Sequence, residues 1–287
     1  MAVIFNGSQV AAAMSGELSR RAASLAAEGV KPTLAILRIG ERAGDIAYEN
    51  AAVKRCRAVG VDVIQRHLPE NAPREKILTE IDAANKASGI HGFLLLRPLA
   101  DAGTEDAARA VLSPEKDVDG MTDASLTGVF SAKPLGFPPC TAEACVALLD
   151  HYSIPLAGRR VTVIGRSLVV GRPLSMLLLA RDATVTLCHS KTADLAEACR
   201  GADIVVSAAG HARLLDRSFF REGQVVVDVG MSADADGGLC GDVCFGEVEP
   251  VVHAITPVPG GVGAVTTAVL ARHVMIAAEI AETQKYK

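Results

Sequence analysis

Short apolar runs alternate with segments of helical periodicity through the first half of the chain. The runs predict buried strands, and apolar residues recurring every three or four positions predict the helices between them. The predicted strands are Thr33–Ile39, Val61–Leu68 and Gly92–Leu96, and the predicted helices are Gly7–Gly29, Ile46–Val59 and Arg74–Ala87. This alternation is typical of parallel sheets built from βαβ units.

The same alternation starts again at Arg159. The predicted strands are Arg159–Gly165, Ala183–Cys188, Ala202–Gly210, Gln224–Gly230 and Ala254–Val258, and the helices are Gly171–Arg181 and Ala193–Arg200. A last helix, from Val265 to about Ala281, is expected to pack on the first domain. We therefore predict an α/β protein with two parallel-sheet domains, the second of Rossmann type.

Residues 100–139 interrupt this pattern. Prolines and glycines punctuate the stretch at Pro114, Gly120, Gly128, Pro134, Gly136, Pro138 and Pro139. Their density predicts a loop-rich region and a domain boundary. A connecting helix is predicted over Thr141–Asp150, with Thr141 as its N-cap. The predicted domains are therefore 1–139, completed by a C-terminal helix at 265–287, and 140–264.

The composition excludes several classes of protein. The chain is 49% hydrophobic, 22% charged and only 3% aromatic, which suits strands buried on both faces. Its formal net charge of −4 argues against a nucleic-acid partner, because such proteins normally carry a basic face. We identify no signal peptide and no apolar run of about 18 residues, so we expect a cytoplasmic protein that does not bind membranes.

The cysteines are interpreted as reduced thiols. There are seven, an odd number, scattered along the chain, which fits the cytosol better than a disulfide framework. The close pairs Cys140–Cys145 and Cys240–Cys244 lack the C-x-x-C spacing of zinc sites, and we expect no metal. The sequence indicates no histidine partner for Cys140, so a buried structural thiol is expected there rather than a nucleophile.

The segment Val161–Ser175 carries the strongest local signal. A β-branched strand ends at Gly165, a loop containing Arg166 and Ser167 follows, and Gly171 opens the next helix. Such a turn presents backbone N–H groups and a helix N-terminus to a phosphate. The segment is not a G-x-G-x-x-G fingerprint, and a simple tight turn is the alternative.

The residues after the next predicted strand favour one dinucleotide. An NAD-binding fold usually places Asp or Glu there to hold the ribose hydroxyls. This chain has His189–Thr192, where Ser190 and Lys191, with the nearby Arg166, form a set suited to a 2′-phosphate. We therefore expect NADP rather than NAD, the alternative being that Lys191 and Arg166 are solvated surface charges.

Together with these segments, several short motifs resemble the bifunctional methylenetetrahydrofolate dehydrogenase/methenyltetrahydrofolate cyclohydrolase family. In the family's order they are KDVDG (Lys116–Gly120), PPCT (Pro138–Thr141), GRSLVVGRP (Gly165–Pro173), CHSKT (Cys188–Thr192), VVDVG (Val226–Gly230), GDV (Gly241–Val243) and ITPVPGGVG (Ile255–Gly263). They span almost the whole chain, and PVPGGVG beside KDVDG is highly specific.

The resemblance implies two α/β domains around a cleft, NADP in the second domain, a tetrahydrofolate derivative as substrate, and a homodimer. By motif, Asp119 would hydrogen-bond the pterin ring and Tyr48 would stack along the folate. The backbone of Pro259, Gly260 and Gly261 would line the same cleft. Contacts to the cofactor would come from Gly165, Arg166, Ser167, Gly171, Ser190 and Met231.

The chain departs from the family at its catalytic lysine. The family's segment reads Tyr-x-x-x-Lys, and an ungapped match from Gly40 to Gly60 places Ala52 four residues after Tyr48. Four residues on a helix return nearly to the same face, whereas six land about 120° away. Lys54 is therefore expected to be an exposed bystander. The missing Tyr-x-x-x-Lys also argues against a short-chain dehydrogenase.

Two further departures follow the same comparison. The family usually carries Gln in a Q-x-P-x-P segment, where this chain has Leu96 followed by Arg97. Neighbouring residues of a strand point to opposite faces, so Arg97 is not an automatic replacement. Ala264 stands where the family usually has Pro. The departures thus cluster in the folate-binding half.

The two reactions of the family make different demands on these positions. Oxidation of 5,10-methylenetetrahydrofolate mainly needs proximity and orientation, whereas hydrolysis of the methenyl product needs water activation and proton transfer. We therefore predict an NADP-dependent dehydrogenase of one-carbon metabolism with weak or lost cyclohydrolase activity. The alternatives are a fully bifunctional enzyme with a substitute for the lysine, a paralogue acting on another one-carbon or pterin adduct, and an inactive binding module.

Overall fold

The protein forms two compact units in a computed structural model that describes residues 1–234 and 238–284. The six-stranded unit comprises Met1–Ala11 and Thr141–Thr266, and the three-stranded unit comprises Ala12–Cys140 and Thr267–Lys287. The boundaries between them fall within the helices α1 (Gly7–Ala27), α6 (Cys140–His151) and α10 (Val262–Gln284). Residues 285–287 of the predicted C-terminal helix lie outside the described residues.

The three-stranded unit contains the parallel sheet predicted from the first half of the chain. Its strands are β2 (Thr33–Ile39), β3 (Asp62–Leu68) and β4 (Gly92–Leu95), in the order β3-β2-β4. The connecting helices are α2 (Ala43–Ala58) and α3 (Arg74–Lys86). Because every pairing is parallel, the carboxyl ends of the three strands meet at one edge of the sheet.

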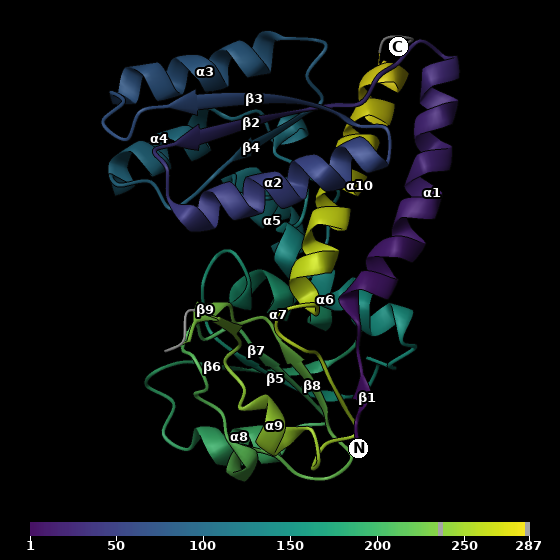
Figure 1. The fold of residues 1–287 in the computed structure, drawn as a ribbon, viewed down its shortest axis with the longest axis vertical. Coiled ribbons are helices and arrows are strands. Elements are labelled where there is room, and N and C mark those ends of the chain that lie inside the picture. Colours follow the sequence, from purple (N-terminus) through teal and green to yellow (C-terminus); the bar gives the residue numbers. More distant parts are fainter. Residues whose placement is uncertain (235–237, 285–287) are drawn as a thin grey trace. The chain divides into compact units, whose positions relative to one another are not determined.

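Alternate residues of these strands face two different layers. Ala35 and Leu37 of β2 and Phe93 and Leu95 of β4 pack in one apolar cluster with residues of α3 and of α4 (Ala102–Val111). Figure 1 shows α2 on the opposite side of the strands from α3. The sheet is therefore covered on both faces, as the apolar character of its strands requires.

The prediction of a loop-rich stretch at 100–139 is wrong in part, because the stretch contains α4, a short 3₁₀ turn η1 (Pro114–Lys116) and α5 (Asp123–Ser131). The sequence pattern hides α4 because its capping residue, Asp101, rather than a long apolar run, defines its start. The Asp101 carboxylate accepts hydrogen bonds from the backbone nitrogens of Gly103 and Thr104 at 3.3 and 2.7 Å.

The six-stranded unit holds an all-parallel sheet in the order β1-β11-β8-β7-β5-β6. Its predicted strands are observed as β5 (Arg160–Ile164), β6 (Thr184–Cys188), β7 (Ile204–Ser207), β8 (Val225–Asp228) and β11 (Ala254–Ile255). The edge strand β1 (Val3–Ile4) was not predicted, and it pairs with β11. This pairing places residues 1–11 in the six-stranded unit rather than with residues 12–139.

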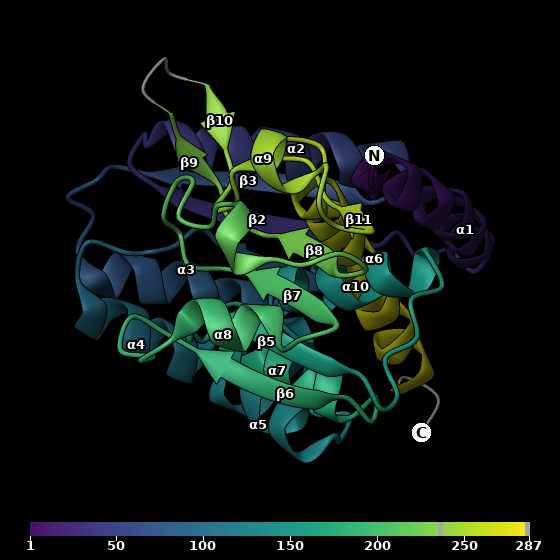
Figure 2. The same cartoon turned by 90° about the horizontal axis from the view of Figure 1, so that it is seen from below.

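Helices cover this sheet as in a Rossmann-type domain. The principal ones are α7 (Gly171–Leu179), α8 (Leu195–Arg200) and α9 (Phe245–Val248), with a 3₁₀ turn η2 (Arg217–Phe219). A small hairpin, β9 (Ser232–Ala233) and β10 (Leu239–Cys240), was not predicted. Figure 2 shows β6, β5, β7 and β8 side by side in this unit.

Helix α6 begins at Cys140, so Thr141 lies inside it instead of capping it. All seven cysteines are free thiols, as predicted. By length and composition alone α10 could cross a membrane, but 67% of its most apolar window is buried, which is also found in core helices of soluble proteins.

Candidate active site

The predicted cofactor residues gather at one edge of the six-stranded sheet. Gly165 follows β5, Ser190 follows β6, Met231 follows β8 and Gly260 follows β11. Because these strands are parallel, their carboxyl ends lie at the same edge, where open α/β sheets bind ligands. The predicted backbone segment Pro259–Gly261 lies at this edge too, since the Gly7 nitrogen donates to the Gly260 carbonyl at 2.9 Å.

Two glycines allow backbone segments to pack closely together at this edge. Gly165 has a φ of +115°, which L side chains rarely adopt, and a Cβ there would collide with the Ala208 carbonyl. A Cβ on Gly171, the first residue of α7, would collide with the Gly165 carbonyl. The turn therefore places the N-terminus of the nine-residue helix α7 beside the backbone of Gly165, with no side chain between them.

Polar side chains flank this glycine turn. Arg166, Ser167, Ser190 and Lys191 are all exposed, and the Ser167 hydroxyl accepts a hydrogen bond from the Val170 nitrogen at 3.1 Å. The cationic side chains are thus available to an anionic ligand, and the residues present fit a dinucleotide with an extra phosphate. Met231 is also strongly exposed, at 68%.

Two buried aspartates hold the loops behind this edge. Asp228 accepts hydrogen bonds from the backbone nitrogens of Gly230, Asp242 and Val243 at 2.9 to 3.1 Å. Asp242 accepts from the Ser207 hydroxyl and from the backbone nitrogens of the loop that follows β7. Burial raises the pKa of Asp228 to about 6, although its backbone donors act in the opposite direction.

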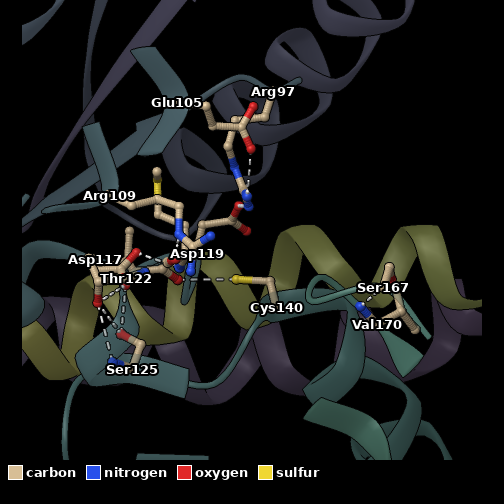
Figure 3. Close-up of polar contacts among 12 residues, drawn as sticks. Arg97, Glu105, Arg109, Asp117, Asp119, Thr122, Ser125, Cys140, Ser167 and Val170 are labelled. Atoms are coloured by element: carbon tan, nitrogen blue, oxygen red, sulfur yellow. Dashed lines mark hydrogen bonds and ion pairs between the residues drawn. The ribbon is translucent and has the colours of Figure 1, made fainter. Parts of the chain in front are cut away.

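The predicted substrate residues Tyr48 and Asp119 come together in the three-stranded unit, with Arg97 beside them. The Arg97 guanidinium lies 3.5 Å from the Asp119 carboxylate and 3.6 Å from that of Glu105 (Figure 3). The side chains of Arg97 and Asp119 are 16% and 19% exposed. The Nε atom of Arg97 is buried and has no acceptor among the described residues, so this N–H is an unsatisfied donor within the cluster.

The protonation of Tyr48 and Asp119 follows from this arrangement. Burial raises the pKa of Tyr48 well above its usual range, and the nearby charge of Asp119 raises it further. Burial also raises the pKa of Asp119, whereas the Arg97 cation opposes that change. Tyr48 therefore stays a hydrogen-bond donor through the neutral range, and Asp119 is the carboxyl whose proton affinity is increased.

The neighbouring Asp117 has a different task from Asp119. It is fully buried, and its carboxylate accepts from the nitrogens of Met121 and Thr122 and from the hydroxyls of Thr122 and Ser125 at 2.6 to 2.9 Å. These bonds close the KDVDG loop and start α5. Asp117 therefore shapes the loop, while Asp119 projects from it towards Arg97 (Figure 3).

The two positions singled out as departures carry no polar group into this cluster. Ala52 is fully buried in α2, one turn after Tyr48, and Leu96 is 4% exposed. Lys54 is exposed on an unbroken helix, as its spacing predicted. The strand β4 ends at Leu95, so strand alternation does not govern Arg97, which lies in the loop beyond it.

Sequence reasoning missed a histidine beside Cys140. The Sγ atom of Cys140 lies 3.6 Å from Nδ1 of His273, which α10 contributes, and both side chains are 1% exposed. No local motif joins residues so far apart in the chain. The available signal was a lone histidine among the apolar residues of the last predicted helix.

Comparison with known proteins gives this arrangement a context. Residues 5–119 match the model of the tetrahydrofolate dehydrogenase/cyclohydrolase catalytic domain, and residues 139–282 match that of the NAD(P)-binding domain. The bifunctional protein FolD of Carboxydothermus hydrogenoformans is 46% identical over 282 residues, which are 98% of each chain. This relative is described as bifunctional, so the comparison does not support the predicted loss of cyclohydrolase activity.

Solved structures agree with these matches. The bifunctional enzyme FolD from Campylobacter jejuni has a TM-score of 0.94 at 34% identity, over 98% of this chain and 99% of that one. FolD of Trypanosoma brucei, solved with NADP and an inhibitor, has a TM-score of 0.92 at 34% identity, over 97% and 98% of the chains. The present chain therefore belongs to the bifunctional tetrahydrofolate dehydrogenase/cyclohydrolase family, with an α/β fold and a C-terminal NAD(P)-binding domain.

Proposed function

We propose that the chain performs both reactions of its family, oxidising 5,10-methylenetetrahydrofolate with NADP and hydrolysing the methenyl product, with Arg97 in place of the missing lysine. The observation that carries the proposal is the Arg97 guanidinium at 3.5 Å from Asp119, in a cluster with Tyr48. It supports the presence of a cation at the site despite Ala52.

The roles of Arg97, Tyr48 and Asp119 in hydrolysis differ because each side chain holds or accepts protons differently. An arginine keeps its charge in proteins, so Arg97 can stabilise an anion or orient a polar group but cannot accept a proton. Tyr48 keeps its proton because burial raises its pKa, so it acts as a donor. Asp119, with its pKa raised by burial, is the group left to take the proton from the attacking water.

Arg97 then has a specific role beside that base. Its charge favours the ionised form of Asp119, which is the form that accepts a proton. Its side chain is 16% exposed, so the accessible N–H groups of the guanidinium can donate to an oxygen or nitrogen of the substrate. A planar guanidinium can meet both demands at once, because its donors diverge in a fixed fork.

The oxidation step depends on the six-stranded unit. When bound, NADP supplies the hydride acceptor. The chain's own contribution is to hold it: Gly165 and Gly171 permit close backbone approach, and Arg166, Ser190 and Lys191 offer a cationic and hydrogen-bonding set for a 2′-phosphate. This set, and the absence of Asp or Glu among residues 189–192, support NADP over NAD.

A second candidate is the narrower function, a dehydrogenase whose cyclohydrolase activity is weak or lost. The observation that favours it is the apolar character of two buried positions, Ala52 and Leu96, where the family resemblance leads us to expect Lys and Gln. Cytoplasmic location and a homodimeric state stay predictions, the latter to be tested by sedimentation of the purified chain.

Two spectrophotometric assays on one preparation test the proposal. NADP reduction with 5,10-methylenetetrahydrofolate reports the dehydrogenase, and loss of added 5,10-methenyltetrahydrofolate, corrected for spontaneous hydrolysis, reports the cyclohydrolase. Both rates above background support the bifunctional proposal. A dehydrogenase rate without enzymatic hydrolysis would establish the narrower function, and NADP binding without either rate would indicate another substrate or an inactive binding module.

A further inference from the structure

Two buried side chains outside the proposed chemistry meet at the residue before Asp119. His273 Nδ1 lies 2.8 Å from the carbonyl oxygen of Val118, and Cys140 Sγ lies 3.1 Å from the same oxygen. Cys140, Val118 and His273 are each at most 1% exposed. The ring of His273 also packs against that of Phe137, with 4.9 Å between centroids, so its position is fixed on a second side.

The shared acceptor decides the proton positions. A carbonyl oxygen can only accept, so Nδ1 of His273 carries a hydrogen and donates it to Val118. The Cys140 thiol likewise donates to that oxygen. A nucleophilic Cys–His pair needs the imidazole nitrogen facing the sulfur to accept the thiol proton, and here that nitrogen is itself a donor. The geometry thus favours two donors on one carbonyl over a nucleophile with its base.

Fixing the Val118 carbonyl also fixes the start of Asp119. The peptide group between the two residues is planar, so its carbonyl direction sets the direction in which Asp119 leaves the chain. On the other side of Asp119, Gly120 has a φ of +69°, and a Cβ there would collide with the backbone of Pro138 and Pro139. Asp119 therefore projects from backbone that is held on both sides.

We propose that Cys140 and His273 are positioning residues that hold the Asp119 carboxyl in line with Arg97 and Tyr48. The proposal rests on the proposed function of Asp119 as the proton acceptor. The pair acts through the Val118 carbonyl and touches no substrate. Cys140 has a second influence, because its single thiol proton can go to the Asp119 carboxylate instead of to Val118, and that donation lowers the pKa of Asp119.

Replacing the donors separates these two influences. His273→Ala removes a donor to Val118, and we expect kcat/KM for the folate substrate to fall about 10-fold through misplacement of Asp119. His273→Asn, which keeps a donor, should recover most of that loss. Cys140→Ala should lower kcat/KM less, and Cys140→Ser should recover it.

The pH profile separates the direct influence of Cys140 on Asp119 from positioning through Val118, and recovery in His273→Asn is the result that a merely structural role would not give. Asp119 faces Arg97, Asp117, Tyr48 and Cys140, and of these Cys140 and Arg97 favour its ionised form. In Cys140→Ala the pKa of Asp119 rises, so the acidic limb of the kcat/KM profile moves to higher pH. In His273→Ala the limb stays and the plateau falls.

Cys145→Ala is the matched control. Cys145 is a buried thiol on the same helix, and its Sγ donates to the Thr141 carbonyl at 3.3 Å instead of to Val118. Cys145→Ala removes a thiol sulfur, as Cys140→Ala does, but far from Asp119 in its contacts, so its pH profile of kcat/KM should match that of wild type. NADP affinity, measured by calorimetry, should be unchanged in every variant. An unmoved limb in Cys140→Ala, or the same shift in Cys145→Ala, would remove the direct influence of Cys140 on Asp119. Failure of His273→Asn to recover the activity lost in His273→Ala would overturn the positioning role.

A spectroscopic test does not depend on activity at all. The ¹⁵N shifts of His273, assigned by its loss in His273→Asn, report which ring nitrogen is protonated. The proposal requires the Nδ1–H form, and a protonated Nε2 with bare Nδ1 would refute it. If the wild-type protein showed neither enzymatic rate, the proposed function would be wrong. This measurement would still show whether His273 donates a hydrogen bond to the Val118 carbonyl.

Discussion

The candidate sites at the edges of the two sheets differ in composition, because one is formed by backbone and the other by side chains. In the six-stranded unit, backbone glycines and the first turn of α7 make the site, and all come from one short segment after β5. In the three-stranded unit, side chains make it, and they come from α2, the loop after β4, the loop before α5, and α10. The first site therefore depends on a backbone path that few residue types can follow, and the second on a set of side chains that several elements supply.

That difference bears on the departures that the family resemblance suggests. Ala52 and Leu96 stand where we expect Lys and Gln, and in our proposal Arg97, which lies beyond the end of β4 and 3.5 Å from Asp119, supplies the cation. The glycine turn offers no such freedom, since Gly165 combines a positive φ with contact to the Ala208 carbonyl. One edge tolerates exchange of its parts, and the other tolerates almost none.

The largest effect should come from Asp119→Asn. The variant removes the proposed proton acceptor while keeping the size of the side chain, so the cyclohydrolase rate should fall about 10²- to 10⁴-fold. The measurement is methenyltetrahydrofolate hydrolysis, with NADP affinity by calorimetry as the control for the other edge. Hydrolysis within a few-fold of wild type would remove Asp119 from the mechanism.

Gly165→Ala should weaken NADP binding at the edge of the six-stranded sheet without affecting the three-stranded unit. The new methyl group meets the Ala208 carbonyl in a backbone conformation that suits glycine, and we expect about 100-fold weaker NADP binding through displacement of the turn. Calorimetry with NADP measures it. Gly246→Ala is the control, since a Cβ there meets nothing within 4 Å in the same unit. Equal losses of NADP affinity in Gly165→Ala and Gly246→Ala would show that the effect is not specific to the glycine turn.

The buried carboxyl of Asp228 predicts a pH effect on stability rather than on chemistry. Burial raises its pKa to about 6 in the folded protein. The group therefore favours folding fully below its unfolded pKa of about 3.9, and this contribution, about 3 kcal/mol for a shift of about two units, is lost as pH rises through about 6.

Urea unfolding of wild type and Asp228→Asn at several pH values between about 4 and 7 isolates that contribution. The variant should show a flatter fall in the free energy of unfolding over this range, whatever its absolute stability. Asp216→Asn is the contrasting control, because Ser218 lowers the pKa of Asp216 and its linkage has the opposite sign. Identical pH slopes for Asp228→Asn and wild type would contradict the assignment.

The smallest effect belongs to Lys54→Ala. Lys54 is exposed on α2, two residues beyond the buried Ala52, and helical geometry turns it away from Tyr48. Both enzymatic rates should stay within about two-fold of wild type, since exposed substitutions rarely alter a distant site. A loss of hydrolysis comparable to that of Asp119→Asn would assign the missing lysine's role to Lys54 instead.

Local pattern was enough to predict the six-stranded edge and most of both sheets. Strand periodicity and the glycine turn lie within single segments, so Gly165 and Gly171 could be placed before any coordinates existed. β1 escaped because a two-residue strand has too few positions to show a period. The helices α4 and α5 are hard to predict because they are short and lie among prolines and glycines that indicate loops.

The three-stranded site could be predicted only in part. Tyr48 and Asp119 came from motifs, but the roles of Arg97 and His273 depend on contacts between segments that sequence spacing does not reveal. The alternation of side chains along a strand argued against Arg97 as a replacement for the expected Gln. That argument assumed that β4 continues past Leu95, which it does not. His273 lies 133 residues from Cys140, beyond the reach of any local pattern.

The central claim is that Arg97 supplies the cation that the family resemblance leads us to expect from a lysine at position 52. It is tested most directly by the ratio of cyclohydrolase to dehydrogenase rates in wild type, Arg97→Leu, and Arg97→Leu combined with Ala52→Lys. We predict that Arg97→Leu lowers the ratio about 100-fold and that the added lysine, one turn after Tyr48, restores part of it. An unchanged ratio in Arg97→Leu would contradict the account.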